Sequence, residues 1–165
     1  MRRQHHPGQA LVIVALFLPI IIGLWLLAIE LAWRFTTAQA VTDALRAANR
    51  SAVQTFDYAA FADNRLALAD PDAVIAVAQR LAATNLSGVR GLTKTPADVA
   101  GTAQWTVLPA GGACILEAGG PTLRFPKPAL CSTARVDLTS PLGFHWTIQV
   151  YAADTLDLSF SSATE

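Results

Sequence analysis

The hydrophobic positions of this chain are concentrated near its N-terminus. Twenty consecutive residues without a charge, Ala10 to Ile29, follow a short segment that carries Arg2 and Arg3. At about 1.5 Å of rise per residue this run forms roughly 30 Å of helix, the thickness of the hydrocarbon core of a bilayer. The pattern therefore predicts a helix long enough to span a membrane.

Small and apolar residues continue past this run at helical spacing, three or four positions apart, with polar residues on the other faces. They are Ala38, Val41, Leu45, Ala48, Ala52 and Phe56. We predict one helix from about Gln9 to Phe56, about 70 Å long, whose second half is amphipathic. Its apolar stripe must be covered by the chain's own C-terminal domain or by helices of neighbouring subunits, and a filament would use both.

A second, shorter helix is predicted where Asp70 can cap free amides, Pro71 suits the first turn and Asp72 suits the positive end of the helix dipole. Apolar residues then repeat at helical spacing until Gly88, which we expect to end the helix. From residue 89 onward, glycine and proline separate short runs rich in β-branched and aromatic residues, which indicates strands.

The predicted strands are residues 104–108 (QWTVL), 114–116, 122–125, 132–138 (STARVDL) and 144–152 (FHWTIQVYA), with an edge strand at 156–160 (LDLSF). In the run 144–152 we expect Phe144, Trp146, Ile148 and Val150 to share one buried face. The turn SPLG before it predicts an antiparallel hairpin. The order of elements gives an α+β class: a long N-terminal helix, a short second helix and a small, mainly antiparallel C-terminal sheet.

Three regions follow from this pattern: a basic leader at residues 1–8, the long helix at 9–56, and one α+β domain at 57–165. Twelve basic and twelve acidic residues are scattered along the chain and give a formal net charge of zero. There is no electrostatic footprint for nucleic acid, so we expect no nucleic-acid partner.

The membrane segment has two interpretations, a cleaved signal peptide or a retained anchor. A secretory signal needs a shorter apolar run, about 7–15 residues, closely followed by small residues. The small-x-small pattern Ala38-Gln39-Ala40 lies well beyond the run, so we favour a retained single-pass anchor. Because Arg2 and Arg3 precede the run, the positive-inside rule places the N-terminus in the cytoplasm and the C-terminal domain outside.

Several residues of this segment are candidate sites. Glu30 and Arg34, four positions apart, can pair at the membrane edge, where Trp33 can also anchor in the headgroup layer. Pro19 and Gly23 lie in the middle of the span. They either kink or locally unwind the helix, or are tolerated because neighbouring groups satisfy the freed carbonyl.

The chain has two cysteines, Cys114 and Cys131. An even count in a domain outside the cytoplasm favours one disulfide over two unrelated thiols. Catalytic motifs are absent: there is no G-x-S-x-G, no H-E-x-x-H, no C-x-x-C and no phosphate-binding glycine loop. We therefore expect no enzyme activity, no cofactor and no metal, with His145 solvated or hydrogen-bonded on the polar face of its strand.

The first fifty residues resemble the N-terminal region of TadE-like proteins, minor pseudopilins of the tight-adherence (Flp-type) pilus machinery. The resemblance rests on Arg2 and Arg3, the Gly-Gln-Ala-Leu-Val start at residues 8–12, Pro19, Glu30, and the alanine-rich stretch 38–52. It implies a pilin-like fold in the inner membrane with a periplasmic domain. It also implies cleavage between Gly8 and Gln9 by a prepilin peptidase, and contact with other pilin-like subunits through the helix.

One position departs from the pattern of that family. Pilin-like proteins usually place a glutamate five residues after the cleaved glycine, where this chain has Ile13. A carboxylate in lipid is costly and is normally paired, so Ile13 removes both the cost and the pairing. We expect a minor subunit at a filament tip or an anchored helper that never polymerises. The alternatives are a plain single-pass anchored binding or structural module of the envelope and, third, an exported enzyme.

Overall fold

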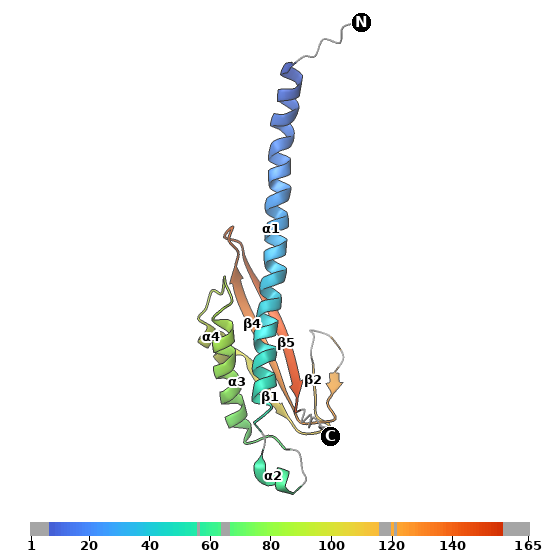
Figure 1. Ribbon diagram of the computed structural model, residues 1–165, viewed down its shortest axis with the longest axis vertical. Coiled ribbons are helices and arrows are strands. Elements are labelled where there is room, and N and C mark those ends of the chain that lie inside the picture. Colours follow the sequence, from blue (N-terminus) through green and yellow to red (C-terminus); the bar gives the residue numbers. More distant parts are fainter. Residues whose placement is uncertain (1–6, 56, 64–66, 116–119, 121, 157–165) are drawn as a thin grey trace, which may run out of the picture.

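The computed structural model describes residues 7–55, 57–63, 67–115, 120 and 122–156. One long helix, α1 (Pro7–Ala52), has an N-terminal half that projects away from a small domain of helices and strands (Figure 1). The predicted α+β class is confirmed: a long apolar helix is followed by a shorter helix and a small antiparallel sheet.

The C-terminal half of α1 packs against the rest of the chain through one stripe of its surface. The buried residues of this stripe recur every three or four positions: Glu30, Thr37, Val41, Ala44, Leu45, Ala48, Asn49 and Ala52. This spacing places them on one side of a helix. The sequence left two partners for the apolar stripe, the chain's own domain and helices of neighbouring subunits. The chain's own domain covers it, through α3 and the sheet.

The long helix ends at Ala52 rather than at the predicted Phe56, which lies outside the described residues. The amide of Thr55 donates to the carbonyl of Ala52 at 3.0 Å, which closes a turn. A short helix that the sequence analysis did not predict, α2 (Tyr58–Ala62), follows. Its first free amides are satisfied by Asp57, whose Oδ1 accepts from the amides of Ala59 and Ala60 at 2.9 and 3.3 Å.

The predicted second helix is α3 (Pro71–Leu86), which buries Val74, Ala78, Ala82 and Leu86. Its ends differ from expectation in two details. The side chain of Asp70 makes no capping hydrogen bond, so the start depends on Pro71 and on Asp72 in the first turn. The helix ends directly before Gly88, as predicted, with Ser87 as the C-cap, but Gly88 does not adopt the left-handed conformation usual for a glycine in this position.

A further helix, α4 (Pro96–Thr102), falls where the sequence analysis expected only strands. The hydroxyl of Thr95 accepts from the amide of Asp98 at 3.1 Å and donates to its carboxylate at 2.7 Å. The first bond is that of a capping box, whereas the Asp98 carboxylate accepts from the Thr95 hydroxyl and not from the Thr95 amide. The signal Thr-Pro-Ala-Asp was readable in the sequence and was missed.

The strands form two sheets instead of one. The larger has the order β1 (Gln104–Leu108), β4 (Ala129–Thr139), β5 (His145–Thr155), with both pairs antiparallel. A separate hairpin pairs β2 (Ala113–Ile115) with β3 (Thr122–Arg124). The predicted hairpin at SPLG is present between β4 and β5, where Thr139 lies opposite His145. Of the expected edge strand, Leu156 is buried, and residues 157–160 lie outside the described residues.

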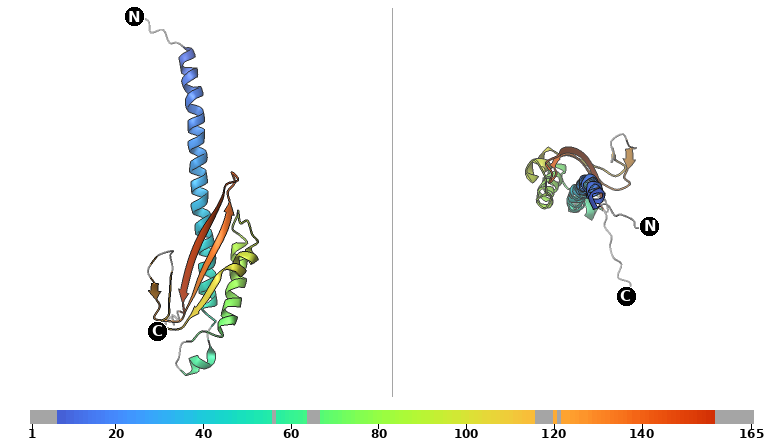
Figure 2. Two further views of the ribbon diagram at one scale, coloured as in Figure 1. Left: turned by 180° about the vertical axis from the view of Figure 1, so that it is seen from behind. Right: turned by 90° about the horizontal axis from the view of Figure 1, so that it is seen from above.

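The two faces of the larger sheet differ as a half-buried sheet requires. Its inner face places Ala134, Val136, Leu138, Val150 and Ala152 against the helices. Figure 2 shows α1 and α3 on this side of the curved sheet. Trp146 and Ile148 pack at the margin of this core as expected. Phe144 does not share the buried face, because it precedes β5 in the hairpin turn and its side chain is 55 % exposed.

Candidate functional site at the junction of the apolar helix and the sheet

The large apolar side chains in the N-terminal half of α1 are exposed. Among the described residues, α1 is long and apolar enough to cross a membrane. Between Ile13 and Ile29, the large apolar side chains are 44 to 68 % exposed. Monomeric soluble proteins rarely present a contiguous apolar surface of this extent. Transfer of such side chains from water to lipid is favourable by about 25 cal/mol per Å² of surface.

Four of the predicted site residues lie along this half of α1. The helix is continuous through Pro19 and Gly23, and it continues in one direction past both (Figure 1). A Cβ atom added to Gly23 would have no neighbour within 4 Å. Gly8 and Gln9 lie in the first turn of α1. The predicted cleavage would therefore leave almost the whole helix attached to the domain.

The predicted pair of Glu30 and Arg34 is formed where the apolar run ends. Nε of Arg34 donates to Oε1 of Glu30 at 3.2 Å. Glu30 is only 6 % exposed, although Ile29 and Leu31 beside it are 53 % and 46 % exposed. Its second oxygen, Oε2, is buried and has no hydrogen-bond partner among the described residues. A charged group in this position depends on Arg34, since burial of an unpaired carboxylate is costly.

Two tryptophans connect this ion pair to the sheet. The rings of Trp33 and Trp146 meet edge to face, with centroids 5.1 Å apart. The guanidinium carbon of Arg34 lies 4.9 Å from the centroid of the Trp146 ring, which is cation–π distance. Trp33 is thus in contact with the domain through Trp146, and its predicted anchoring in the headgroup layer remains a prediction. We refer to Glu30, Trp33, Arg34 and Trp146 as the junction cluster.

Gly91 completes the junction and was not identified from the sequence. Its φ is +82°, a left-handed conformation that favours glycine. A Cβ atom here would overlap Cη2 of Trp33 and lie 2.5 Å from the carbonyl oxygen of Thr139. The loop between α3 and α4 therefore passes close to α1 and to the end of β4 at once. No local sequence signal indicates this contact, because it depends on residues far apart in the chain.

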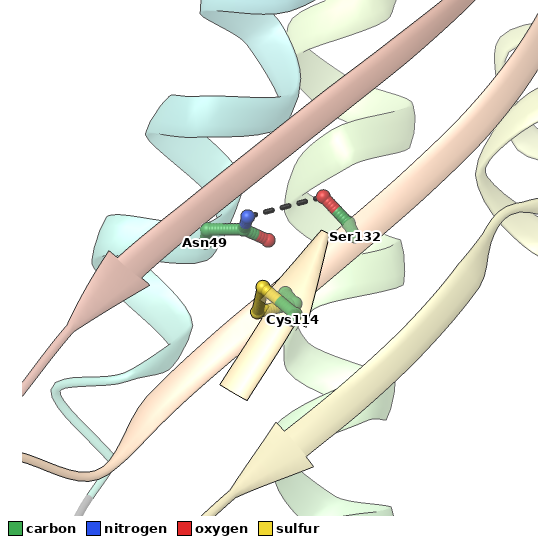
Figure 3. Close-up of a disulfide and its surroundings, with 4 residues drawn as sticks. Asn49, Cys114 and Ser132 are labelled. Carbon is green, nitrogen blue, oxygen red and sulfur yellow. Dashed lines mark hydrogen bonds between the residues drawn. A yellow bond between two sulfur atoms is a disulfide. The ribbon is translucent and has the colours of Figure 1, made fainter. Parts of the chain in front are cut away.

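The predicted disulfide between Cys114 and Cys131 is confirmed. It ties β2 to β4 on the outer face of the larger sheet, close to a polar contact on the inner face (Figure 3). In that contact, Nδ2 of Asn49 donates to Oγ of Ser132 at 3.0 Å, and both side chains are buried. The Oδ1 atom of Asn49 has no hydrogen-bond partner among the described residues.

The disulfide also shapes a groove of about 570 Å³ between the small hairpin and the larger sheet. Its polar lining comes from four strands, β1, β3, β4 and β5: Gln104, Thr106, Thr122, Thr133, Gln149 and Tyr151. Amide and hydroxyl groups of this kind can hold a neutral polar ligand by hydrogen bonds. None of the described lining residues is a carboxylate, a histidine or a free thiol.

Two other features bear on chemistry. Within the described ranges, no three side chains of His, Cys, Asp or Glu are grouped closely enough to hold a metal ion. His145 is exposed, and its Nδ1 lies 2.8 Å from the hydroxyl of Thr139, the hydrogen-bonded state expected for it. An apolar pocket of about 290 Å³ lies at the end of the domain far from the junction, lined by Leu68, Pro71, Val107, Pro109 and Pro128 among others.

No family model, curated protein or solved structure matches this chain. The class of protein is therefore defined by its own architecture. It is an α+β protein in which one N-terminal helix, long and apolar enough to cross a membrane, continues into the core of a disulfide-containing domain.

Proposed function

We propose that this protein is a non-catalytic, pseudopilin-like minor component of a pilus or secretion assembly. It is held in the inner membrane by one span, with the N-terminus in the cytoplasm and the domain on the periplasmic side. A prepilin peptidase processes it between Gly8 and Gln9, and the exposed part of α1 packs against pilin-like helices within the bilayer.

The observation that carries the proposal is the two-part character of α1. Its outer half has a stripe that the domain buries, whereas its N-terminal half is apolar and exposed over its large side chains. A simple anchor needs only the span. A helix that continues without interruption into the core also fixes the direction of the domain relative to the membrane, which an assembly of parallel subunits requires.

The second candidate is a single-pass anchored binding or structural module that does not polymerise. Ile13 favours it, because this residue, 51 % exposed, has no carboxylate that could pair with the amino terminus of a neighbouring subunit. The polar groove under the small hairpin is the surface such a module would use.

The N-terminus of the native protein separates these candidates. Intact mass and N-terminal sequencing of protein purified from native membranes should give a start at Gln9 for the pseudopilin and at Met1 for the plain anchor. A start at Val41 would mean a released protein and would overturn both.

A substitution tests the same point. Gly8→Phe should abolish the Gln9 start, because the peptidase cuts after a glycine. Gly23→Phe is the matched control, since a Cβ atom added there has no neighbour within 4 Å in the subunit, and it should be processed as the wild type is. Equal processing of Gly8→Phe and wild type would contradict the proposal.

A further inference from the structure

We propose that the turn between β4 and β5, residues 140–144, is a second membrane contact that inserts into the headgroup layer beside α1. The partner is the lipid of the leaflet that faces the domain. This inference rests on the proposed anchoring of α1 in a bilayer and adds a contact that no feature of the span itself requires.

The turn presents apolar side chains outward. Leu142 is 45 % exposed and Phe144 is 55 % exposed. Residues 140–146, Ser-Pro-Leu-Gly-Phe-His-Trp, contain no carboxylate that would resist entry into the headgroup layer. Exposed aromatic and aliphatic side chains on a tip without acidic side chains, lysine or arginine are typical of surfaces that enter the boundary between headgroups and acyl chains.

The turn is held rigidly in place. The amide of Ser140 donates to the carbonyl of Phe144 at 2.8 Å, and the amide of Phe144 donates to the hydroxyl of Ser140 at 3.1 Å. The neighbouring loop braces it, because the amide of Thr139 donates to the carbonyl of Gly91 at 2.7 Å. Little conformational entropy remains to be lost on insertion, so the apolar contact is realised at low cost.

The position of the turn along the axis of α1 determines whether the turn reaches the membrane. Trp146 contacts Trp33 and Arg34 of α1. Phe144 lies two residues closer to the tip, up to about 7 Å along an extended chain. One turn of α1, from Trp33 to Ile29, covers about 6 Å. The turn therefore reaches the level at which the uncharged run of α1 ends, and Figures 1 and 2 show the tip of the β4–β5 hairpin standing off to one side of α1.

Lipid is favoured over a protein partner because the turn lies at the level of the exposed apolar surface of α1. The exposed apolar surface of α1 extends past the ion pair to Phe35, which is 70 % exposed. If α1 spans a bilayer, Phe35 and the turn lie at the same boundary as the last residues of the span. The domain has other exposed apolar residues, Ile115 and Leu123, but these lie on the small hairpin away from the junction.

The test measures depth in the membrane with a nitroxide spin label. Leu142→Cys is labelled in the full chain, with the native disulfide intact, and reconstituted into vesicles of phosphatidylcholine and phosphatidylglycerol. Ala73→Cys, exposed near the start of α3, is the matched control away from the junction. Ile22→Cys, in the middle of the span, reports whether α1 crosses the bilayer. The readout is the ratio of collision rates with dissolved oxygen and with a water-soluble nickel chelate.

We expect this ratio at Leu142 to be several-fold above that at Ala73 and below that at Ile22. A ratio at Leu142 equal to that at Ala73, with a high ratio at Ile22, overturns the inference and leaves the anchoring intact. A ratio at Ile22 as low as that at Ala73 overturns the anchoring, and the inference with it.

Discussion

The indole ring of Trp146 on β5 stands edge to face against the ring of Trp33 on α1, with centroids 5.1 Å apart and an interplanar angle of 85°. This contact joins the apolar helix to the sheet at the point where the helix leaves its exposed segment. C-terminal to this contact, one stripe of α1 is buried by the domain, whereas N-terminal to it the large apolar side chains of α1 are exposed and Glu30 is buried. The junction cluster therefore lies at the boundary between the buried and the exposed parts of α1.

A double-mutant cycle measures this contact. Trp33→Ala, Trp146→Ala and the double variant should show a coupling of about 0.5–1.5 kcal/mol in the free energy of unfolding, the range for aromatic pairs in this geometry. The measurement is denaturant unfolding of the full chain in detergent, followed by near-ultraviolet circular dichroism. Additive losses, with no coupling, would contradict the role given to the pair.

Substitution of Gly91 separates backbone strain from the close contact. Gly91→Ala should lower the free energy of unfolding by about 1 kcal/mol for the positive φ and by about 1–3 kcal/mol more for the clash with Trp33. Gly111→Ala is the matched control, because Gly111 has a φ of +81° but no atom within 4 Å of an added Cβ. Equal losses for the two variants would mean that the loop does not press on α1.

The buried contact between Asn49 and Ser132 should be sensitive to removal of one partner. Ser132→Ala leaves Nδ2 of Asn49 buried without an acceptor, and we expect a loss of about 1–3 kcal/mol. The double variant Asn49→Leu with Ser132→Ala removes both polar groups and should recover part of that loss. If the free energy of unfolding of the double variant is no higher than that of Ser132→Ala, this account of the contact is wrong.

Loss of the disulfide should act mainly on the small hairpin. Replacement of Cys114 and Cys131 by Ser opens a loop with a sequence separation of 17. For a loop of this size we expect a loss of about 3 kcal/mol. Amide hydrogen exchange should accelerate in β2 and β3 and change little in β4 and β5, which keep their own pairing. Equal acceleration in all four strands would contradict this division.

Asp154 gives the domain a dependence on pH. Burial raises the pKa of its carboxyl above the ordinary value of 3.8, and Arg50 and Arg46 oppose the shift only in part. A raised pKa in the folded state favours the protonated form. The corresponding stability is complete below 3.8 and is lost as the pH rises through the raised pKa. Wild type should therefore gain stability relative to Asp154→Asn as the pH falls toward 3.8, in unfolding curves of both proteins at several pH values. A difference that stays constant over this range would show that Asp154 has no raised pKa.

Local patterns in the sequence predicted the elements that depend on neighbouring residues. The uncharged run and the spacing of three and four placed α1, the Asp-Pro-Asp start placed α3, and the SPLG turn placed the hairpin of β4 and β5. The pair Glu30 and Arg34 was also readable, because two residues four apart on a helix meet whatever the fold. The helix α4 was not predicted, although its capping residues Thr95 and Asp98 are visible in the sequence.

The sequence by itself determined that one helix is apolar for the length of a bilayer, that its outer half needs a cover, and that one disulfide is possible. Only the tertiary structure decided what covers that half, that Trp146 packs against Trp33, that Gly91 has no room for a side chain, and that Phe144 is exposed at the tip of a turn. The reason is physical: periodicity and capping act over a few residues, whereas these contacts join segments that the chain brings together only when the core closes.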